Sequence, residues 1–370
     1  MKKQKICFIL STLQAGGVEN YLLRFLKYSH GKYDVTILCA SNENAHLLKD
    51  YEQLGVRIVF KKTGYYNLIL LFKLYKFFSV NNFSVVCNFS GNFSGPSLLL
   101  SKIAKIPCRI ASYRRSSNAF GVNKLRSLYN YLCNRLVYFN ATDILSNSEF
   151  ALKVFFPLEY KNDRKFQVIK NGVDNNTFLP NKDCVVSRYK FKIPQNAFVI
   201  GHVGRYDWSK NHTTIIQVAH IILQKFDDVV FVFCGKDTDS KEFKKSVAES
   251  DFSDRFILLG VQKDVPGVLQ LMDLFYFPSV TEGQPNALIE AMLTGLPVIA
   301  SNIEPIRETI PESAHDTLLD PLNVHDAVDL ISSLKVDVNK RQEFIHKDWA
   351  ENQYDLQRNL NLFNDVIDAR

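Results

Sequence analysis

The stretch TEGQPNALIEAM at residues 281–292 decides both the fold and the site. An apolar run at 274–277 precedes it, and a second apolar run at 295–300 follows it. Pro285 suits the first turn of a helix, because its missing N–H would have no partner there anyway. The stretch therefore predicts a strand, a loop that carries Glu282, a helix that carries Glu290, and another strand.

The start of the predicted helix is suited to a phosphate or diphosphate. The backbone N–H groups of Asn286, Ala287 and Leu288 are expected to have no partner inside the helix, and the helix dipole is positive at this end. Such a helix end attracts anions. Gly283 would let a ligand come close to the backbone.

Polar side chains that bind hydroxyl groups lie on either side of this phosphate position. Glu290, one turn into the helix, is placed to accept two hydrogen bonds from a ribose diol. Glu282 is placed to hold a second polyol such as a sugar, with Gln284 and Asn286 beside it. The order of ribose, diphosphate and sugar is that of a nucleotide sugar. Acidic residues near a helix start often serve only as partners of the helix dipole, so the stretch alone leaves both interpretations open.

A diphosphate next to two carboxylates requires cations. The loop at 204–211 follows the first predicted strand of the second half, and it carries Arg205 and Lys210 after Gly204. Because loops at the carboxyl ends of parallel strands gather at one edge of a sheet, we expect both cations at the edge that carries Glu282. Arg205 would grip phosphate with two hydrogen bonds, and Lys210 would act as a point charge.

Strand and helix patterns alternate through both halves of the 370 residues. This alternation predicts two doubly wound α/β domains with parallel sheets. We place the first domain at 1–175 and the second at 185–345, with a polar linker around their junction. A helix at about 345–370 is expected to pack back on the first domain.

Charge is divided unevenly along the chain. Residues 1–170 hold 25 Lys and Arg against 9 Asp and Glu, whereas residues 171–370 hold 20 against 29. The basic half predicts a polyanionic partner. Two basic, aromatic helical stretches, 61–78 and 124–139, favour an anionic membrane surface, although either one alone also fits an ordinary helix that covers a sheet. No motif for binding nucleic acid is present, and no apolar run is long enough to span a membrane.

The seven cysteines occur singly, without metal-ligand spacing, and most of them lie in apolar runs. They indicate reduced thiols in the cytosol and no structural zinc. Asp237 and Asp239 resemble a metal-binding DxD motif, but polar loops after strands are common and we expect no metal there. With Arg205 and Lys210 in place of a metal, we expect no cofactor and activity in the presence of a chelator.

These residues together resemble one family, the retaining GT-B glycosyltransferases of family 4, group 1. Glu282 and Glu290 match its E-x7-E motif, and Val203, Gly204 and Arg205 with Lys210 match its phosphate-binding segment. Further similar segments are the glycine pair Gly16 and Gly17, the stretches 146–148 and 171–174, and the base-binding loop with Gly260, Val261 and residues 264–265. The resemblance covers most of the chain.

The resemblance implies two Rossmann-like domains that face each other across a cleft. It also implies transfer of a sugar, with retention of configuration, from a nucleoside diphosphate sugar to an acceptor bound by the first domain. Arg205, Lys210 and Glu282 would act in catalysis, and Gly16 and Gly17 would admit the diphosphate and the acceptor. The expected acceptor is a polyprenyl-diphosphate-linked glycan or an oligosaccharide of a bacterial surface polysaccharide, and the expected location is the cytoplasmic face of the plasma membrane.

One position departs from the family pattern. Many members carry a histidine near the reacting sugar after a strand of the first domain, and Ser112 stands at the matching position here. Arg114, two residues on, is the candidate for a further contact with a diphosphate or an acceptor phosphate. The departure leaves open a non-catalytic partner subunit that has kept the fold. A separate alternative is a sugar-nucleotide 2-epimerase of the same fold, which would need no acceptor. The sequence does not choose the donor sugar, the base, the acceptor or the linkage.

Overall fold

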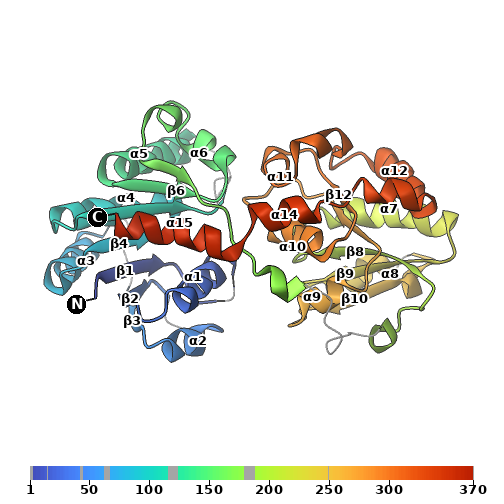
Figure 1. Ribbon diagram of the computed structural model, residues 1–370, viewed down its shortest axis with the longest axis horizontal. Helices are drawn as coiled ribbons and strands as arrows, with labels where there is room; N and C mark the ends of the chain where they lie inside the picture. Colours follow the sequence, from blue (N-terminus) through green and yellow to red (C-terminus); the bar gives the residue numbers. More distant parts are fainter. Residues whose placement is uncertain are drawn as a thin grey trace. The chain divides into compact units, whose positions relative to one another are not determined.

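A computed structural model describes residues 3–14, 16–41, 45–61, 67–115, 124–178, 188–248 and 250–369 (Figure 1). The chain forms two compact units, Met1–Gly172 with Leu356–Arg370, and Val173–Asp355. Each unit has one parallel sheet with helices on both faces, which confirms the predicted pair of doubly wound α/β domains. Within the described ranges, no helix has the length and apolar character needed to cross a membrane.

The first unit is built on a seven-stranded sheet with the order β3-β2-β1-β4-β5-β6-β7. Its strands are β1 (Lys5–Leu10), β2 (Asp34–Cys39), β3 (Arg57–Phe60), β4 (Val85–Asn88), β5 (Cys108–Tyr113), β6 (Asp143–Ser146) and β7 (Phe166–Val168). Its helices are α1 (Gly17–Tyr28), α2 (Leu48–Gln53), α3 (Leu68–Asn81), α4 (Gly95–Ile103), α5 (Lys124–Asn140), α6 (Glu149–Phe155) and α15 (Leu356–Asp368). The short strand β7 and the helix α6 were not predicted from the sequence.

The second unit repeats the same design with five strands in the order β10-β9-β8-β11-β12. Its strands are β8 (Phe198–Val203), β9 (Val229–Cys234), β10 (Phe256–Gly260), β11 (Leu274–Phe277) and β12 (Val298–Ala300). Its helices are α7 (His212–Lys225), α8 (Lys241–Ala248), α9 (Val265–Leu269), α10 (Asn286–Thr294), α11 (Glu304–Arg307), α12 (Val324–Val336), α13 (Val338–Gln342) and α14 (Lys347–Gln353). Strands β8, β9 and β11 are buried along their whole length, which is why they read as continuous apolar runs.

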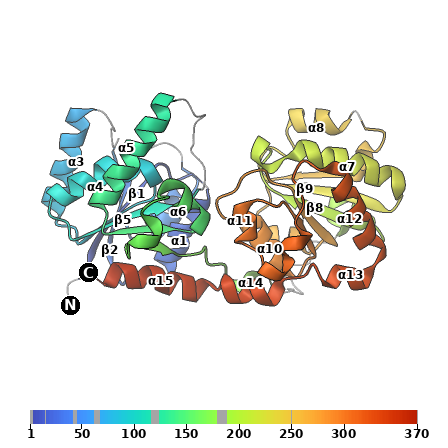
Figure 2. The ribbon, with the colours of Figure 1, turned by 90° about the horizontal axis from the view of Figure 1, so that it is seen from above.

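The helices of the first unit form two layers. Helices α1 and α15 share one core with the sheet, whereas α3, α4 and α5 pack against its other face. Figure 2 shows α3, α4 and α5 together on the side of the sheet away from α15. The ring of Phe363 in α15 lies 4.6 Å from that of Phe25 in α1, so the last helix completes the core of the first unit.

The structure sets the domain boundaries differently from the sequence reading. The first unit ends at Gly172, and the short 3-10 helices at Asn175–Phe178 and Arg188–Phe191 belong to the second unit. At the other end the chain returns at Leu356, not near residue 345, because α14 packs against α10. The polar composition of 175–196 suggested a linker, but Phe178 and Ile193 are buried in the core of the second unit.

Candidate functional site

The carboxyl edge of the second sheet has a topological switch point between β8 and β11. The chain proceeds from β8 through β9 to β10 on one side, and β11 and β12 lie on the other. In open parallel sheets, ligands bind outside the carboxyl ends of the strands where the order reverses. The loop after β8 carries Arg205 and Lys210, and the loop after β11 carries Glu282, so the topology directs both loops to this point.

The structure brings Lys210 and Glu282 into direct contact. The Lys210 ammonium donates to Oε1 of Glu282, and the two side chains are only 17% and 10% exposed. The same ammonium lies 5.0 Å from the centre of the Phe277 ring at the end of β11. A largely buried ion pair is strongly coupled, since removal of one partner leaves the other charge desolvated.

Hydrogen bonds to backbone carbonyls hold the loop after β8 against the loop after β11. The amide of Val280 donates to the carbonyl of Ser209 at 2.9 Å, and the side chain of Asn211 donates to the carbonyl of Pro278 at 3.1 Å. Asp207 starts the short 3-10 helix Trp208–Lys210 by accepting from the Ser209 amide at 3.0 Å. Burial alone would raise the pKa of Asp207, but these hydrogen bonds and the nearby cations hold it below its usual value.

Gly204 is required where the loop leaves β8. A side chain at this position would meet Nε2 of His202 at 2.9 Å and the Lys210 side chain at 3.3 Å. The amide of Gly204 donates to the carbonyl of Cys234, and the amide of Gly235 donates to the carbonyl of Gly260. The ends of β8, β9 and β10 are thus joined by closely packed glycines, which leaves backbone rather than side chains along this part of the edge.

The start of α10 differs in two details from the sequence reading. Pro285 is the N-cap and not a residue of the first turn, because its ψ of 88° is not helical. The Leu288 amide, expected to be unpaired, donates to the Pro285 carbonyl at 3.1 Å. The Leu288 amide is thus the first that donates to the N-cap carbonyl, and the amides of Asn286 and Ala287 come before it in the helix. Helices often close their first turn in this tighter 3-10 manner.

Glu290 and Gln284 lie on two sides of this helix start. Glu290 is half-buried, and its charge, together with burial, raises the pKa of the Cys234 thiol to about 11, which places the carboxylate near the end of β9. Gln284 is hydrogen-bonded to the buried hydroxyl of Tyr354, which donates to the carbonyl of Thr309. Gln284 therefore also has a structural partner on the side away from β9.

Gly260 and Val261 form the end of β10. Gly260 has a φ of +62°, and a side chain there would meet the Asp239 carboxylate at 2.6 Å. Val261 is exposed at the edge of the sheet. This arrangement leaves an open apolar side chain next to tightly packed backbone, which is suitable for a flat ring such as a nucleobase.

Arg205 lies in the expected loop but is not part of the buried ion pair. Its side chain is 66% exposed, and its Nε lies 3.8 Å from Oδ2 of Asp207. Lys210 is the buried cation of this site, whereas Arg205 stands at its exposed rim.

Two buried histidines beneath the loop were missed in the sequence. His202 in β8 donates from Nδ1 to the carbonyl of Tyr276 at 3.0 Å, and its ring meets that of His212 edge-to-face at 4.9 Å. Burial is the main cause that lowers the pKa of His212 to about 4 and that of His202 well below its usual value. Both rings are therefore neutral at pH 7. His202 lies in an apolar run and His212 follows a polar loop, and neither position gave a signal beyond that of an ordinary histidine.

The carboxyl edge of the first unit carries the predicted glycine pair. Gly16 is the N-cap of α1 and Gly17 its first residue, and the Glu19 carboxylate folds back so closely that Gly16 has no room for a side chain. Burial raises the pKa of Glu19. The sequence reading had not assigned Glu19, although its place in the first turn of the helix is a recognisable signal.

Ser112 and Arg114 have structural partners that correct one expectation. Ser112 is fully buried, and its hydroxyl accepts from Nε of Arg114 at 3.2 Å, so Ser112 is not placed to touch a ligand. Nη1 of Arg114 donates to Asn171 at 2.7 Å, and its guanidinium lies 3.6 Å from the centre of the Tyr21 ring. Arg114 is thus fixed in place by three neutral groups, and none of them cancels its charge.

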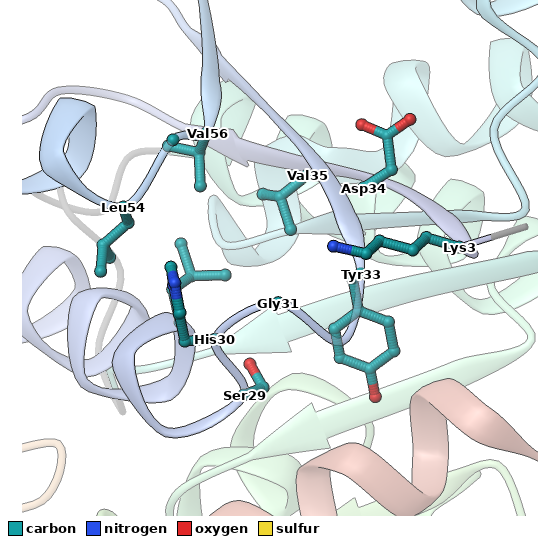
Figure 3. A pocket seen from close by; sticks show the side chains of 11 residues that line it. Lys3, Ser29, His30, Gly31, Tyr33, Asp34, Val35, Leu54 and Val56 are labelled. Atoms are coloured by element: carbon teal, nitrogen blue, oxygen red, sulfur yellow. The ribbon is translucent and has the colours of Figure 1, made fainter.

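No group of three or more His, Cys, Asp or Glu side chains with metal-binding geometry occurs among the described residues. Two cavities lie elsewhere in the first unit. One of about 290 Å³ lies at the amino ends of β1 and β2, and Figure 3 shows Lys3, His30 and Asp34 around it. The other, of about 240 Å³, lies beside α5 and contains the Arg135–Glu159 ion pair. Neither belongs to the carboxyl edge described above.

Comparison with known families matches both units. Residues 15–177 match the model described as glycosyltransferase family 4, and residues 186–348 match the model described as glycosyl transferases group 1. The chain belongs to glycosyltransferase family 4, group 1. In this glycosyltransferase, the segment that matches the group 1 model includes both residues of the Lys210–Glu282 ion pair.

Curated relatives of the glycosyltransferase include one named for transfer to a lipid-linked sugar and one named for capsular polysaccharide biosynthesis. It is 28% identical to the UDP-Gal:alpha-D-GlcNAc-diphosphoundecaprenol alpha-1,3-galactosyltransferase of Escherichia coli, over 81% of this chain and 80% of that protein. It is 26% identical to the capsular polysaccharide biosynthesis glycosyltransferase CapH of Staphylococcus aureus, over 81% of this chain and 82% of that protein.

Solved structures of the same fold extend over nearly the whole glycosyltransferase. Anabaena HepE in complex with UDP superposes with a TM-score of 0.83 at 18% identity, covering 99% of this chain and 100% of HepE. WaaG, a glycosyltransferase of lipopolysaccharide biosynthesis, superposes with a TM-score of 0.74 at 13% identity, covering 99% of this chain and 100% of WaaG. The fold is GT-B, as expected from the sequence.

Proposed function

We propose that this glycosyltransferase moves a sugar from a UDP-linked donor to a lipid-linked or oligosaccharide acceptor of a bacterial surface polysaccharide, with retention of configuration. The observation that carries the proposal is the buried Lys210–Glu282 pair at the switch point, beside the start of α10. The UDP preference is supported by the UDP-Gal donor in the name of the Escherichia coli relative and by the UDP bound in HepE.

The proposed donor orientation follows from the order of groups along the edge. The base lies at Gly260 and Val261, the ribose diol at Glu290, and the diphosphate at Lys210 and the amides of Asn286 and Ala287. The sugar lies at Glu282 and the backbone from Gly283 to Asn286. In this order Lys210, the largely buried cation of the loop after β8, lies next to the diphosphate oxygen that becomes negative when the bond to the sugar breaks.

The chemistry of the step requires charge stabilisation at the leaving diphosphate. As the bond between the anomeric carbon and the diphosphate oxygen breaks, its electron pair stays on the diphosphate, and Lys210 and Arg205 stabilise that charge. The acceptor oxygen bonds to the same face of the anomeric carbon, and its proton passes to the leaving phosphate. No metal and no side-chain base is needed for this balance, which accommodates the absence of a histidine at position 112.

In this proposal the acceptor approaches the first unit, where Gly16, Gly17 and Arg114 mark the carboxyl edge. The Escherichia coli relative acts on a diphosphoundecaprenol-linked sugar, and a lipid-linked acceptor of this kind would bring the enzyme to the cytoplasmic face of the membrane. The guanidinium of Arg114 has the charge to meet an acceptor phosphate.

The test uses UDP- and GDP-linked hexoses with and without undecaprenyl-diphosphate-linked sugar, in buffer with a chelator. We expect transfer from a UDP-sugar, with the new bond in the anomeric configuration of the donor by NMR. Conversion of donor to its epimer without acceptor would instead show an epimerase. Tight UDP binding without any turnover would show a non-catalytic partner, and loss of activity in chelator would disprove the metal-free mechanism.

A further inference from the structure

Helices α3 and α5 of the first unit leave a group of large apolar side chains in solvent. Leu68, Ile69 and Phe72 lie in the first half of α3, and they are 65% to 81% exposed. In α5, the apolar residues Leu128, Tyr131 and Leu132 are more than half exposed. We call these six residues the amino-end patch, since they lie in the first half of each helix.

The patch is not the result of a poorly packed helix. Helix α3 is fixed to the sheet by Leu74, Phe77 and Phe78, which are buried in the core below it. Asn67 caps its start by accepting from the amides of Ile69 and Leu70. The helix is therefore anchored by its second half, while the apolar first half extends beyond the core.

Both helices extend in the same direction. In Figure 2 the amino-terminal ends of α3 and α5 stand out on one side of the first unit, with α4 packed between the helices at their bases. Each helix follows a strand of a parallel sheet, so each begins at the carboxyl edge of that sheet. This is the edge that carries the glycine pair of α1 and the fixed guanidinium of Arg114.

The stretch of sequence that forms these helices carries charge of one sign, although Glu159 from outside this stretch pairs with Arg135 of α5. Residues 53–142, which include α3, α4 and α5, contain 13 Lys and Arg and no Asp or Glu. Lys73 and Lys76 lie exposed on α3, and within the described part of the chain neither has a carboxylate within ion-pair distance. Exposed apolar side chains among unpaired cations match an anionic lipid surface, where the side chains enter the interface and the ammonium groups meet the head groups.

We propose that the amino-end patch of α3 and α5, with Lys73 and Lys76, docks this protein on anionic bilayers. A single-stranded nucleic acid would need aromatic platforms in a basic groove, and aliphatic side chains such as Leu68 and Ile69 add nothing to that binding. Under the function proposed above, docking at the carboxyl edge brings a membrane-held acceptor to Arg114.

The test measures binding of the whole chain to vesicles by co-sedimentation. Vesicles of equal parts phosphatidylglycerol and phosphatidylethanolamine are compared with vesicles of phosphatidylcholine alone. We expect binding to the anionic vesicles that weakens with added salt, and little binding to phosphatidylcholine. Absence of binding to the anionic vesicles, or equal binding to both kinds, would overturn the proposal.

Matched variants test whether vesicle binding depends on the amino-end patch or on exposed apolar side chains in general. The triple change Leu68→Ser, Ile69→Ser and Phe72→Ser is expected to weaken anionic vesicle binding on the order of 100-fold. Lys73→Gln and Lys76→Gln are each expected to weaken it about fivefold. The control changes the exposed Val336 and Val338 of the second unit to Ser, and it should bind vesicles like the unchanged protein.

Donor hydrolysis in detergent-free buffer separates this proposal from the proposed function. The triple patch variant should hydrolyse the UDP-sugar at the rate of the unchanged protein, because none of its positions belongs to the donor site. Loss of vesicle binding with hydrolysis retained supports the patch. Equal loss in the valine control refutes it. A variant that changes sedimentation from oligomer to monomer while vesicle binding stays the same would show that the patch joins two copies of the chain.

Discussion

The two units share the order of their first five strands but hold their key cations in opposite ways. In the second unit, Lys210 is neutralised by the carboxylate of Glu282. In the first unit, Arg114 is held by a hydroxyl, an amide and an aromatic ring, none of which carries charge. Under the proposed function, Lys210 exchanges its carboxylate for the donor diphosphate. The Arg114 guanidinium has no carboxylate partner among the described residues, so it adds to the positive charge of a basic unit. The same fold thus supplies one site for a compact charged group and one surface for anions.

The largest expected effect concerns the paired cation. Lys210→Met should lower kcat of transfer on the order of 10²–10³-fold, because charge on the leaving diphosphate loses its buried partner. It should also lower the melting temperature, since the largely buried carboxylate of Glu282 loses the charge of Lys210. The double variant Lys210→Met with Glu282→Gln should recover the melting temperature but not the rate.

The control for this prediction is Lys225→Ala at the exposed end of α7, which should leave both quantities unchanged. A Lys210→Met protein with the rate of the unchanged enzyme would remove the contrast between the two units.

The second prediction uses the buried histidines, which give the second unit a pH dependence of its own. Because the pKa of His212 is lowered from 6.5 to about 4, the unfolded chain binds a proton in this range that the folded chain does not. The contribution of neutral His212 to the free energy of unfolding is therefore fully present above pH 6.5. It is lost as the pH falls toward 4, and the loss is roughly 3 kcal/mol.

Denaturant unfolding at a series of pH values from about 7.5 down to about 4.5 measures this loss. The range includes the ordinary histidine pKa of about 6.5. His212→Leu should flatten the curve, and His325→Gln, at the exposed start of α12, should not. An equal slope in all three proteins would assign the pH dependence to other groups.

The third prediction concerns the unpaired guanidinium of the first unit. Arg114→Leu should raise KM for a phosphate-bearing acceptor by about tenfold or more, as expected for loss of a charged hydrogen bond, with KM for the donor nearly unchanged. It should also destabilise the first unit by about 1–3 kcal/mol, because Asn171 and Ser112 lose their partner.

Steady-state kinetics with each substrate varied in turn checks this division. Arg57→Leu, which removes a surface hydrogen bond from Arg57 to Asn81, is the matched variant and should change neither KM. A larger effect of Arg114→Leu on the donor would show that this cation serves the donor diphosphate instead.

The smallest effect compares one glycine from each unit. Gly31 and Gly260 both have positive φ, but a side chain at Gly31 meets nothing, whereas one at Gly260 meets Asp239. Gly31→Ala should cost about 1 kcal/mol from backbone strain alone, and Gly260→Ala should cost about 1–2 kcal/mol more. The double change Gly260→Ala with Asp239→Ala should recover that excess in urea unfolding. Equal costs for the two single changes would show that β10 does not end in close packing.

The sequence was sufficient for the fold and for the main features of the second site. Continuous apolar strands between helices identify parallel sheets, and the placement of Lys210 and Glu282 in loops after β8 and β11 follows from the sheet rule. Other features depend on tertiary contacts and could not be read. The Leu288 amide is taken by a tight first turn, and Ser112 is buried under Arg114 because Asn171, far along the chain, holds the other end of the guanidinium.

The boundaries failed for a related reason. Polar composition near 175–196 is typical of a linker, but a few buried side chains such as Phe178 are enough to attach such a segment to a core. Glu19 was missed because its role depends on a backward fold of its side chain over Gly16, which a residue pattern does not encode.

The return of the chain at Leu356 has a consequence for synthesis on the ribosome. The first unit combines residues up to Gly172 with the late helix α15, and contacts join the two segments: Tyr33 bonds to Asn364 and Lys32 pairs with Asp368. Its core cannot close until α15 has left the exit tunnel, although the residues of the second unit emerge before α15. Until that moment the nascent chain exposes Phe25 and its neighbours. A truncation that removes α15 would therefore disable the half of the enzyme that is made first.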